Sequence, residues 1–423
     1  MKSIKPIFSI VIIITLLFAL IPTTKVHAYT YLRVNQTTTI DDGSCTPTHC
    51  TIREAIHYAT SGDTIDFAPL LSGQTIVLDD GPLFIDKNLT INGSALSDHV
   101  VISGDNQMMV FVIGTGFDAT FISLDITEAK YGLFGGGVFI NGEGNSIIVN
   151  DVNFYDNEAQ SGAAIGIKGD GRVTVINSNF KNNASTNGCG GAIFIDDNGT
   201  FDITNSEFVS NESEHEGGAI CLKNGSANIE NSTFTGNFAV SQGGAIYLFP
   251  DTSMTITNTT IFSNAVDVYP ICYGGGIFAD DNSELIISNS TISNNKAQLG
   301  GGLYLDMDAN VSITNTILAN SSSGYDCYRY YANVLTNTAN LVETNAPQPY
   351  KCAFPVISAD PALGRLQDNG GPTRTMAIGS DSPALDAGDN SVCESTDQRG
   401  YSRPVDGDGD HSSVCDIGAY ELQ

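Results

Sequence analysis

The amino-acid sequence predicts an all-β protein: a right-handed parallel β-helix with a short N-terminal capping helix and a loop-rich, disulfide-stapled C-terminal cap. Two observations support this prediction. A unit of about 27 residues repeats from residue 135 onward, and a fixed period of that length is typical of repeat architectures. Within each unit, apolar and polar residues alternate in steps of two, which is the period of a β-strand and not that of a helix.

The repeating unit begins at a glycine step. The first glycines of successive steps are separated by 27, 28, 27, 26, 31 and 26 residues: Gly135, Gly162, Gly190, Gly217, Gly243, Gly274 and Gly300. The polar residues that close the second strand keep nearly the same separations: Asp151, Asn177, Asn205, Asn231, Asn258, Asn289 and Asn315. Because the two series agree, the units are equivalent rungs, and the one long unit carries an insertion near "AVDVYPICYG".

Each unit contains two short strands with one buried face. The first strand has an aliphatic residue behind the glycines, at Val138, Ile165, Ile193, Ile220, Ile246, Ile277 and Leu303. No helical segment separates the strands, so equal strands of consecutive units stack in parallel and coil into a solenoid. The chirality of parallel connections predicts a right-handed coil. We expect the β-helix over residues 63–325, with weaker rungs before residue 135.

Polar and aromatic residues also recur at fixed places in the unit. Asparagine at the end of the second strand tolerates a left-handed backbone and suits a turn. A second column follows six residues later: Asn157, Asn183, Asn211, Asn237, Asn264 and Asn295. Stacked asparagines bond one another as a ladder. An apolar wedge lies between the columns, at Phe154, Phe180, Phe208, Phe234, Ile261 and Ile292.

The paired signatures GGA-I and F-x-x-N resemble the polymorphic outer-membrane protein repeat, a β-helix module of secreted adhesins. GGAI stands at residues 190–193, 217–220 and 243–246, and F-x-x-N begins at Phe154, Phe180, Phe208 and Phe234. Later units depart from the pattern, with GGG in place of GGA and isoleucine in place of phenylalanine. The resemblance implies an adhesin-like protein.

The N-terminal 62 residues divide into a leader and a cap. Residues 1–28 have two early lysines, an apolar core and a Val-His-Ala end, as in a secretory signal peptide. We expect a strand and a capping helix over residues 29–62. Residues 50–56 resemble the CSLREAI signature that opens many exported β-helix proteins. Thr51 and Glu54 also form a capping box, and a helix here covers the open apolar end of the solenoid.

The C-terminal segment, residues 326–423, is expected to form a loop-rich cap. From about residue 360 it resembles the choice-of-anchor Q domain. The matching pieces are DNGGPT at 368–373, SPALDAG at 382–388, DQRG at 397–400 and CDIGAYE at 415–421. This resemblance implies an extracellular or cell-surface protein.

The chain has nine cysteines, which an exported protein can oxidise. Three pairs flank short segments and are expected disulfides: Cys45–Cys50, Cys327–Cys352 and Cys393–Cys415. Cys189, Cys221 and Cys272 fall on different units at different positions, so we expect no bond among them. The odd total leaves at least one thiol free.

The charge balance limits the partners. The chain has 47 acidic and 18 basic residues, a net charge of −29. Such a chain lacks the basic surface that nucleic acids, anionic membranes and other polyanions require. No stretch after the leader reaches the length of a membrane-spanning helix. We expect a monomeric, secreted or cell-surface protein whose partner is an extracellular glycan or a surface protein.

One outward position of the first strand is mostly aromatic. Its aromatic members are the candidate binding residues: Phe139, Phe194, Tyr247, Phe278 and Tyr304. Exposed rings in a row can stack on sugars or dock a partner. The alternative is that the rings stack on one another or are covered by a neighbouring loop.

The stretch DGDGD at residues 406–410 is the candidate metal site. Asp406, Asp408 and Asp410 stand at alternate positions of a loop, and Ca²⁺ prefers such oxygen ligands. The EF-hand pattern fails, because His411 replaces its glycine and Ile417 its glutamate. A solvated acidic turn is the alternative, and we expect no other cofactor.

β-Helix folds also carry polysaccharide lyases and hydrolases, so catalysis is a serious alternative. Glycosidic cleavage needs two carboxylates at a defined separation. The acid pairs at residues 79–80, 196–197 and 280–281 have the composition of turns, and no catalytic residue is assigned. We expect a non-enzymatic protein of adhesion or extracellular recognition. The alternative is a polysaccharide lyase or glycoside hydrolase of the pectate-lyase-like β-helix class.

Overall fold

The computed structural model describes residues 32–130, 132–266, 272–352 and 357–423. The signal peptide expected at residues 1–28 and the centre of the insertion, residues 267–271, lie outside them. Within these ranges, no helix has both the length and the apolar character needed to cross a membrane.

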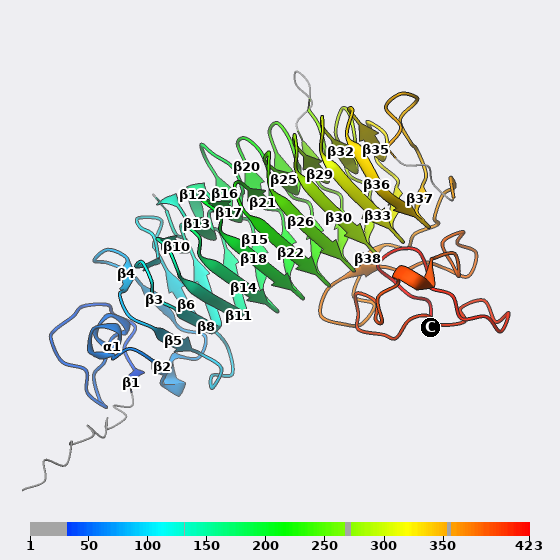
Figure 1. Cartoon of the computed structure of the whole chain (residues 1–423). Helices are drawn as coiled ribbons and strands as arrows, with labels where there is room; N and C mark the ends of the chain where they lie inside the picture. The colour runs from blue at the N-terminus through cyan, green and yellow to red at the C-terminus, as the bar shows by residue number, and fades with distance from the viewer. Residues whose placement is uncertain (1–31, 131, 267–271, 353–356) are drawn as a thin grey trace, which may run out of the picture. The chain divides into compact units, whose positions relative to one another are not determined.

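From Leu32 onward the chain forms a parallel β-solenoid, in which each strand pairs with the strand of the next rung (Figure 1). The predicted all-β parallel β-helix is confirmed. The rungs run through three sheets of ten, six and 21 strands. The described pairings between strands are parallel except in one small hairpin of the cap.

The ten-stranded sheet holds the first strand of each unit. Its strands are β4 (Leu83–Ile85), β7 (Phe111–Ile113), β10 (Val138–Asn141), β13 (Ile165–Lys168), β17 (Ile193–Asp196), β21 (Ile220–Leu222), β25 (Ile246–Leu248), β29 (Ile277–Ala279), β32 (Leu303–Leu305) and β35 (Cys327–Arg329). The predicted inward aliphatic residues are fully buried.

The 21-stranded sheet has two rows of strands side by side. At its N-terminal end lie β1 (Leu32–Val34), β2 (Asp63–Phe67), β3 (Thr75–Val77), β5 (Leu89–Asn92) and β6 (Val100–Ser103), and the long strands β8 (Ala119–Thr127) and β11 (Ser146–Tyr155) cross both rows. The first row continues with β14 (Arg172–Ile176), β18 (Thr200–Thr204), β22 (Ser226–Glu230), β26 (Ser253–Thr257), β30 (Glu284–Ser288), β33 (Asn310–Thr314) and β36 (Asn333–Thr338). The second row continues with β15 (Asn179–Lys181), β19 (Glu207–Val209), β23 (Thr233–Thr235), β27 (Thr260–Phe262), β31 (Thr291–Ser293), β34 (Ile317–Ala319) and β37 (Leu341–Val342).

The six-stranded sheet closes six consecutive rungs, each with a short strand. Its members are β9 (Gly132–Phe134), β12 (Glu158–Ser161), β16 (Ala184–Ser185), β20 (Glu212–Ser213), β24 (Phe238–Ala239) and β28 (Ala265–Val266).

The two rows meet at the predicted asparagine column. Each residue of this column, from Asp151 to Asn315, has a left-handed backbone with φ between 45° and 58°. Asparagine and aspartate adopt this conformation more readily than other non-glycine residues. The turn that we expected at this position is therefore confirmed.

The interior contains the predicted ladder and wedge. From Asn157 to Asn264, each Nδ2 donates to the Oδ1 of the asparagine one rung later, over 2.9–3.0 Å. The Phe154, Phe180, Phe208 and Phe234 rings stack with centroids 4.5–5.0 Å apart. Both columns are buried, so they stabilise the rungs and are not open to a ligand.

The N-terminal end carries the short helix α1 (Ile52–Tyr58). Thr51 and Glu54 make the predicted capping box. Arg53 donates to three carbonyls, those of Thr39, Gly81 and Pro82. Arg53 and Glu54, the two charged residues of the CSLREAI-like stretch, therefore have structural roles at the N-terminal end of the solenoid. A single 3₁₀ turn, η1 (Pro69–Leu71), follows the second strand.

The C-terminal cap lies against the side of the solenoid, along the second row of the 21-stranded sheet. Figure 1 shows it in orange and red beside the last rungs. It contains the antiparallel pair β38 (Leu366–Gln367) and β39 (Thr375–Met376) and the turn η2 (Asn390–Val392). Its Ile378, Ala384 and Ile417 pack on Ile317 and Leu341. The parallel rungs extend to β37, beyond residue 325, where we expected the cap to begin.

Candidate functional site

The cap covers one outward column of the second strand row. Gln398 Nε2 donates to Thr233 Oγ1 over 2.9 Å, and its Oε1 accepts from Thr260 Oγ1 at 2.6 Å. The Ala419 amide donates to Thr291 Oγ1 over 3.0 Å. Gln398 and the three threonines' side chains are buried by this contact. The same column continues toward the N-terminal rungs as Glu207, Asn179 and Asn153. Asn179 is exposed, and Glu207 and Asn153 are half-buried.

A second outward column lies two residues further along each strand of this row. It runs beside the edge of the cap. Its members stand in parallel register: Tyr155, Lys181, Val209, Thr235, Phe262 and Ser293. The five from Tyr155 to Phe262 are exposed or half-buried. We call this column the groove floor.

Two walls border the groove floor. On one side, Arg374 of the cap reaches Glu207, with 2.8 Å between Arg374 Nη2 and Glu207 Oε2. On the other side each rung turns through a left-handed residue, in a column of small and polar residues: Asp156, Asn182, Ser210, Gly236, Ser263 and Asn294. We call the channel between these walls the cap-edge groove.

The cap-edge groove contains two hollows, each of about 480 Å³. The first is lined by Asn153, Phe154, Tyr155, Asp156, Asn179, Lys181, Asn182, Glu207, Val209 and Arg374. The second is lined by Phe262, Ser293, Asn294, Asn320, Leu363, Gly364, Arg365, Leu366 and Met376. Solenoid strands form one side of each hollow and the cap forms the other.

A charged cluster adjoins the first hollow. His99 Nδ1 lies 2.8 Å from Asp125 Oδ1, and His99 Nε2 lies 3.2 Å from Asp151 Oδ2. Asn153 Nδ2 donates to Asp125 Oδ1 over 2.7 Å, which links the cluster to the groove. The hydrogen bond to Asp125 raises the pKa of His99. Because both ring nitrogens face carboxylates, His99 is suited to hold a proton and not to remove one.

Tyr155 forms the aromatic end of the first hollow. Burial raises the pKa of its phenol, and the nearby charge of Asp125 adds to the effect. The phenol therefore stays neutral and can donate a hydrogen bond, while its ring offers an apolar face. A half-buried ring beside the amides of Asn153 and Asn179 is suited to a ligand with apolar faces and hydroxyl edges, such as a sugar.

The predicted aromatic column is outward, as expected, but it is covered. Phe194, Tyr247, Phe278 and Tyr304 are each at most 5% exposed. Tyr247 and Phe278 stack at 5.1 Å, as do Phe278 and Tyr304. The expectation of an exposed binding column is wrong for these four residues. The alternation of side chains along a strand predicts which of them point out of the solenoid, but not whether other residues cover them. Phe139 is half-buried and contacts Phe134.

The turns that lie over this aromatic column also explain a disulfide that we did not expect. Cys189 and Cys221 form a disulfide, with 5.7 Å between their Cα atoms. Cys189 precedes the glycine turn of one rung. That turn lies over the outward position of the next rung, because a Cβ added to Gly190 would lie 3.1 Å from the Cys221 Cβ. Residues at different positions in their units therefore meet. The three expected pairs, Cys45–Cys50, Cys327–Cys352 and Cys393–Cys415, are formed, and Cys272 is a buried cysteine outside these four disulfides.

In the acidic loop, two of the three candidate metal ligands lie close to the carboxylate of a residue that the sequence analysis did not single out. Carboxylate oxygens of Asp406, Asp408 and Asp386 lie within 4.8 Å of one another. Asp410 accepts from the Ser412 amide, and it is not part of that group. Burial raises the pKa of Asp386. Ca²⁺ binding here stays a prediction, with Asp386 in place of Asp410.

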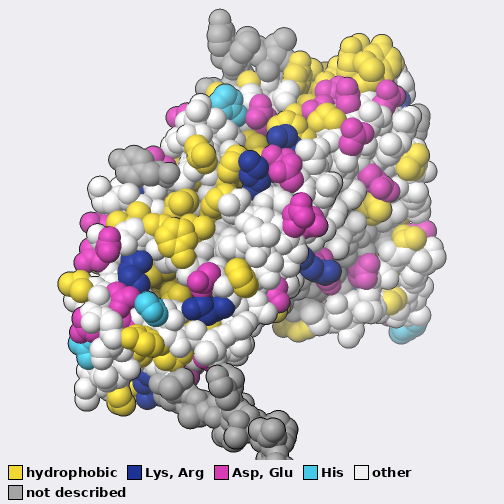
Figure 2. Space-filling model, turned by 60° about the vertical axis from the view of Figure 1, so that its left-hand side comes forward, with side chains coloured by type: hydrophobic (Ala, Val, Ile, Leu, Met, Phe, Trp, Pro, Cys, Tyr) yellow, Lys and Arg dark blue, Asp and Glu magenta, His cyan; other side chains and the backbone are white. Residues whose placement is uncertain are grey.

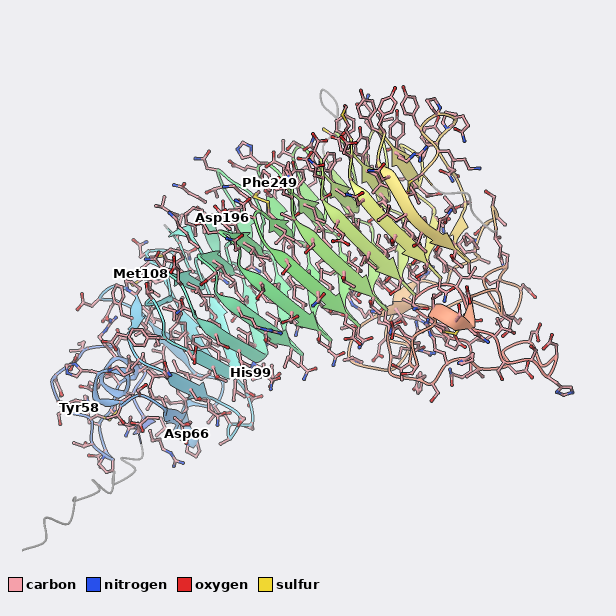
Figure 3. The ribbon with its side chains drawn as sticks, viewed as in Figure 1. Tyr58, Asp66, His99, Met108, Asp196 and Phe249 are labelled. Carbon is pink, nitrogen blue, oxygen red and sulfur yellow. A yellow bond between two sulfur atoms is a disulfide. The ribbon has the colours of Figure 1, made fainter. Side chains whose placement is uncertain are left out.

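The acid pairs 196–197 and 280–281 lie where strands of the ten-stranded sheet end, with Asp196 as the last residue of β17 and Asp280 directly after β29. Asp280 accepts from Tyr247 Oη over 2.6 Å, and Asp196 pairs with Lys223 at 3.0 Å. In Figure 3, Asp196 and Phe249 lie on the upper edge of the ribbon and His99 on the lower edge. These carboxylates therefore do not converge with the cap-edge groove.

Comparison with known proteins shows similarity in fold. A family model described as a right-handed β-helix region matches residues 191–353. This stretch is similar to right-handed β-helix proteins. No curated protein matches the chain. Among solved structures, pectate lyase Pel9A aligns with a TM-score of 0.55 at 14% identity, covering 93% of this chain and 96% of that one. A rhamnogalacturonan lyase aligns with a TM-score of 0.37 at 11% identity, covering 73% and 87%.

The groove floor was missed by the sequence reasoning, although its signal was present. Each member directly follows the apolar wedge of its unit, as Tyr155 follows Phe154 and Phe262 follows Ile261. The repeat alignment places these residues in one outward column. What the alignment lacks is the cap, which turns that column into a groove.

Proposed function

We propose that this is an exported, non-enzymatic protein of extracellular recognition or adhesion that binds a glycan in the cap-edge groove. The observation that carries the proposal is the groove floor, where a half-buried Tyr155 ring lies beside exposed amides and between two polar walls. Glycans present alternating apolar faces and hydroxyl edges, and such sites combine aromatic rings with a few polar groups. The leader at residues 1–28 and the four disulfides support export.

A glycan array tests the proposal. The purified protein is expected to bind a defined set of glycans, and Tyr155→Ala is expected to weaken that binding about 3- to 10-fold, the loss that one stacked ring accounts for. Phe84→Ala is the matched control, because Phe84 is 61% exposed on the ten-stranded sheet, away from the cap. An array without any bound glycan, or equal effects of the two substitutions, contradicts the proposal.

A polysaccharide lyase or glycoside hydrolase is the second candidate. The observation that favours it is the presence of Lys181, Arg374, Glu207 and Asp156 around one hollow. Against it, Arg374 Nε contacts both oxygens of Glu207, at 3.1 and 3.0 Å, and Asp156 Oδ1 accepts from Asn182 Nδ2 at 3.1 Å. Both carboxylates are therefore engaged with neighbours, which does not suit a free acid and base pair.

Incubation with uronic-acid polysaccharides and Ca²⁺ separates the two candidates. The recognition protein is expected to release no product. Rapid formation of an unsaturated product, followed by ultraviolet absorbance, supports the lyase. Lys181→Ala and Glu207→Gln then identify whether this groove is the source of the activity.

A further inference from the structure

The cap-edge groove has an aromatic ring at each of its hollows. Tyr155 on β11 lines the first hollow and Phe262 on β27 lines the second. Both rings belong to the groove floor and are separated by four rung steps, through Lys181, Val209 and Thr235. Rungs are spaced by the distance between neighbouring strands, so the rings are about 19 Å apart along the solenoid axis.

The floor between the rings is accessible. Val209 and Thr235 are both half-buried, and neither side chain is large. One short cap segment borders both hollows, since Arg374 lines the first, and Leu366 and Met376 line the second. The two hollows therefore lie on the same column of the solenoid and beside the same cap segment, with Thr235 between them lining neither.

The charges along this channel are mixed. Lys181 and Arg374 share the first hollow with Asp156 and Glu207, and Arg365 lines the second. The whole chain carries a net charge of −29. Figure 2 likewise shows basic and acidic side chains side by side on one face of the molecule, within a surface of mostly uncharged groups. A polymer with a carboxylate on every sugar needs a continuous basic strip, and the groove does not provide one.

From these observations, and resting on the proposed function, we infer that the ligand is a linear, uncharged polysaccharide. It lies along the solenoid axis beside the cap and covers both rings, so that Tyr155 and Phe262 each stack on a sugar. A mono- or disaccharide is too short to reach both rings. The affinity therefore rises with chain length until the chain spans both hollows.

Isothermal titration with neutral linear oligosaccharides, from disaccharides to octasaccharides of cello-, xylo- and manno-series, tests the inference. One series is expected to bind with an affinity that rises with length. Phe262→Ala is expected to weaken octasaccharide binding about 3- to 10-fold and to leave trisaccharide binding at the Tyr155 end unchanged. Thr235→Arg places a long side chain between the rings without removing any buried contact. It is likewise expected to weaken octasaccharide binding and to leave trisaccharide binding unchanged. The Phe84→Ala control is expected to change neither.

Each outcome decides between the two proposals. If short and long chains bind equally tightly and both groove variants leave octasaccharide affinity unchanged, the axial mode is wrong while glycan recognition stands. If polygalacturonate binds more tightly than any neutral chain, the uncharged class is wrong. If no glycan binds at all, the proposed function itself is wrong, and the inference falls with it.

Discussion

Arg374 of the cap and Glu207 of strand β19 are 167 residues apart in sequence, and their side chains form a salt bridge. The Arg374 backbone amide also donates to Glu207 Oε1 over 2.9 Å. The Glu207 side chain is 17% exposed and the Arg374 side chain 37%. This pair fixes the edge of the cap against the solenoid and thereby defines one wall of the groove.

Removal of this pair is expected to loosen the cap edge. A double-mutant cycle with Arg374→Ala and Glu207→Ala is expected to give a coupling free energy of about 1 kcal/mol, near the upper end for accessible ion pairs, since Glu207 is mostly buried. Denaturant unfolding measures the cycle, and hydrogen exchange of residues 360–380 locates the loosening. The Arg172–Asp202 pair is the control, because Arg172 is 63% exposed and its coupling is expected to be smaller. Equal coupling in the two cycles contradicts the role assigned to Arg374.

The rungs could be predicted because each unit has the same residue types at the same positions. The left-handed turn at Asn205, the buried Asn211 and the stacked Phe208 follow from residue chemistry that recurs every 27 residues or so, and each is confirmed. The capping box at Thr51 and Glu54 is also local. Such features require no knowledge of distant parts of the chain.

The candidate site could not be predicted in the same way, because it depends on contacts without a period. The Gln398–Thr233 contact joins residues 165 apart, and no unit signals it. The burial of Phe194 and Tyr247, and the Cys189–Cys221 bond, depend on how a loop of one rung covers the next. Strand parity decides only whether a side chain points into the solenoid or out of it.

The buried asparagine ladder is expected to be a main source of stability in the middle rungs. Asn237→Ala removes the Oδ1 acceptor of both the Asn211 amide and its Nδ2, and it removes the Nδ2 donor to the Phe208 carbonyl. Unsatisfied buried polar groups are costly, so we expect a loss of about 2–4 kcal/mol in the free energy of unfolding. Asn228→Ala, at an exposed asparagine of β22, is expected to cost less than about 0.5 kcal/mol. Urea unfolding compares the two, and similar losses contradict a special role of the ladder.

The Cys189–Cys221 disulfide is expected in the native protein, with Cys272 as the cysteine that is in no disulfide. Peptide mapping without reduction is expected to recover four linked pairs and to label Cys272 only after denaturation, because it is buried. The double substitution Cys189→Ser with Cys221→Ser opens a loop whose ends are 32 residues apart, and is expected to cost about 3 kcal/mol. Recovery of Cys189 linked to Cys272, or of three pairs only, contradicts this pairing.

The cap is expected to lose stability as the pH rises from about 4.5 to 7. Burial raises the pKa of Glu421 to about 7, above its ordinary value of 4.5, and the pKa of Asp416 to about 6. Between these values the folded cap binds more protons than the unfolded chain, so the free energy of unfolding falls with increasing pH. The decrease attributable to Glu421 is at most about 3 kcal/mol, complete above pH 7 and absent below about pH 4.5.

Hydrogen exchange of residues 380–423 across this pH range measures the decrease. Glu421→Gln is expected to flatten the profile, whereas Glu212→Gln, at an exposed position of β20, is expected to leave it unchanged. A cap that becomes more stable between these pH values, or a profile identical in the Glu421→Gln variant, contradicts the assignment.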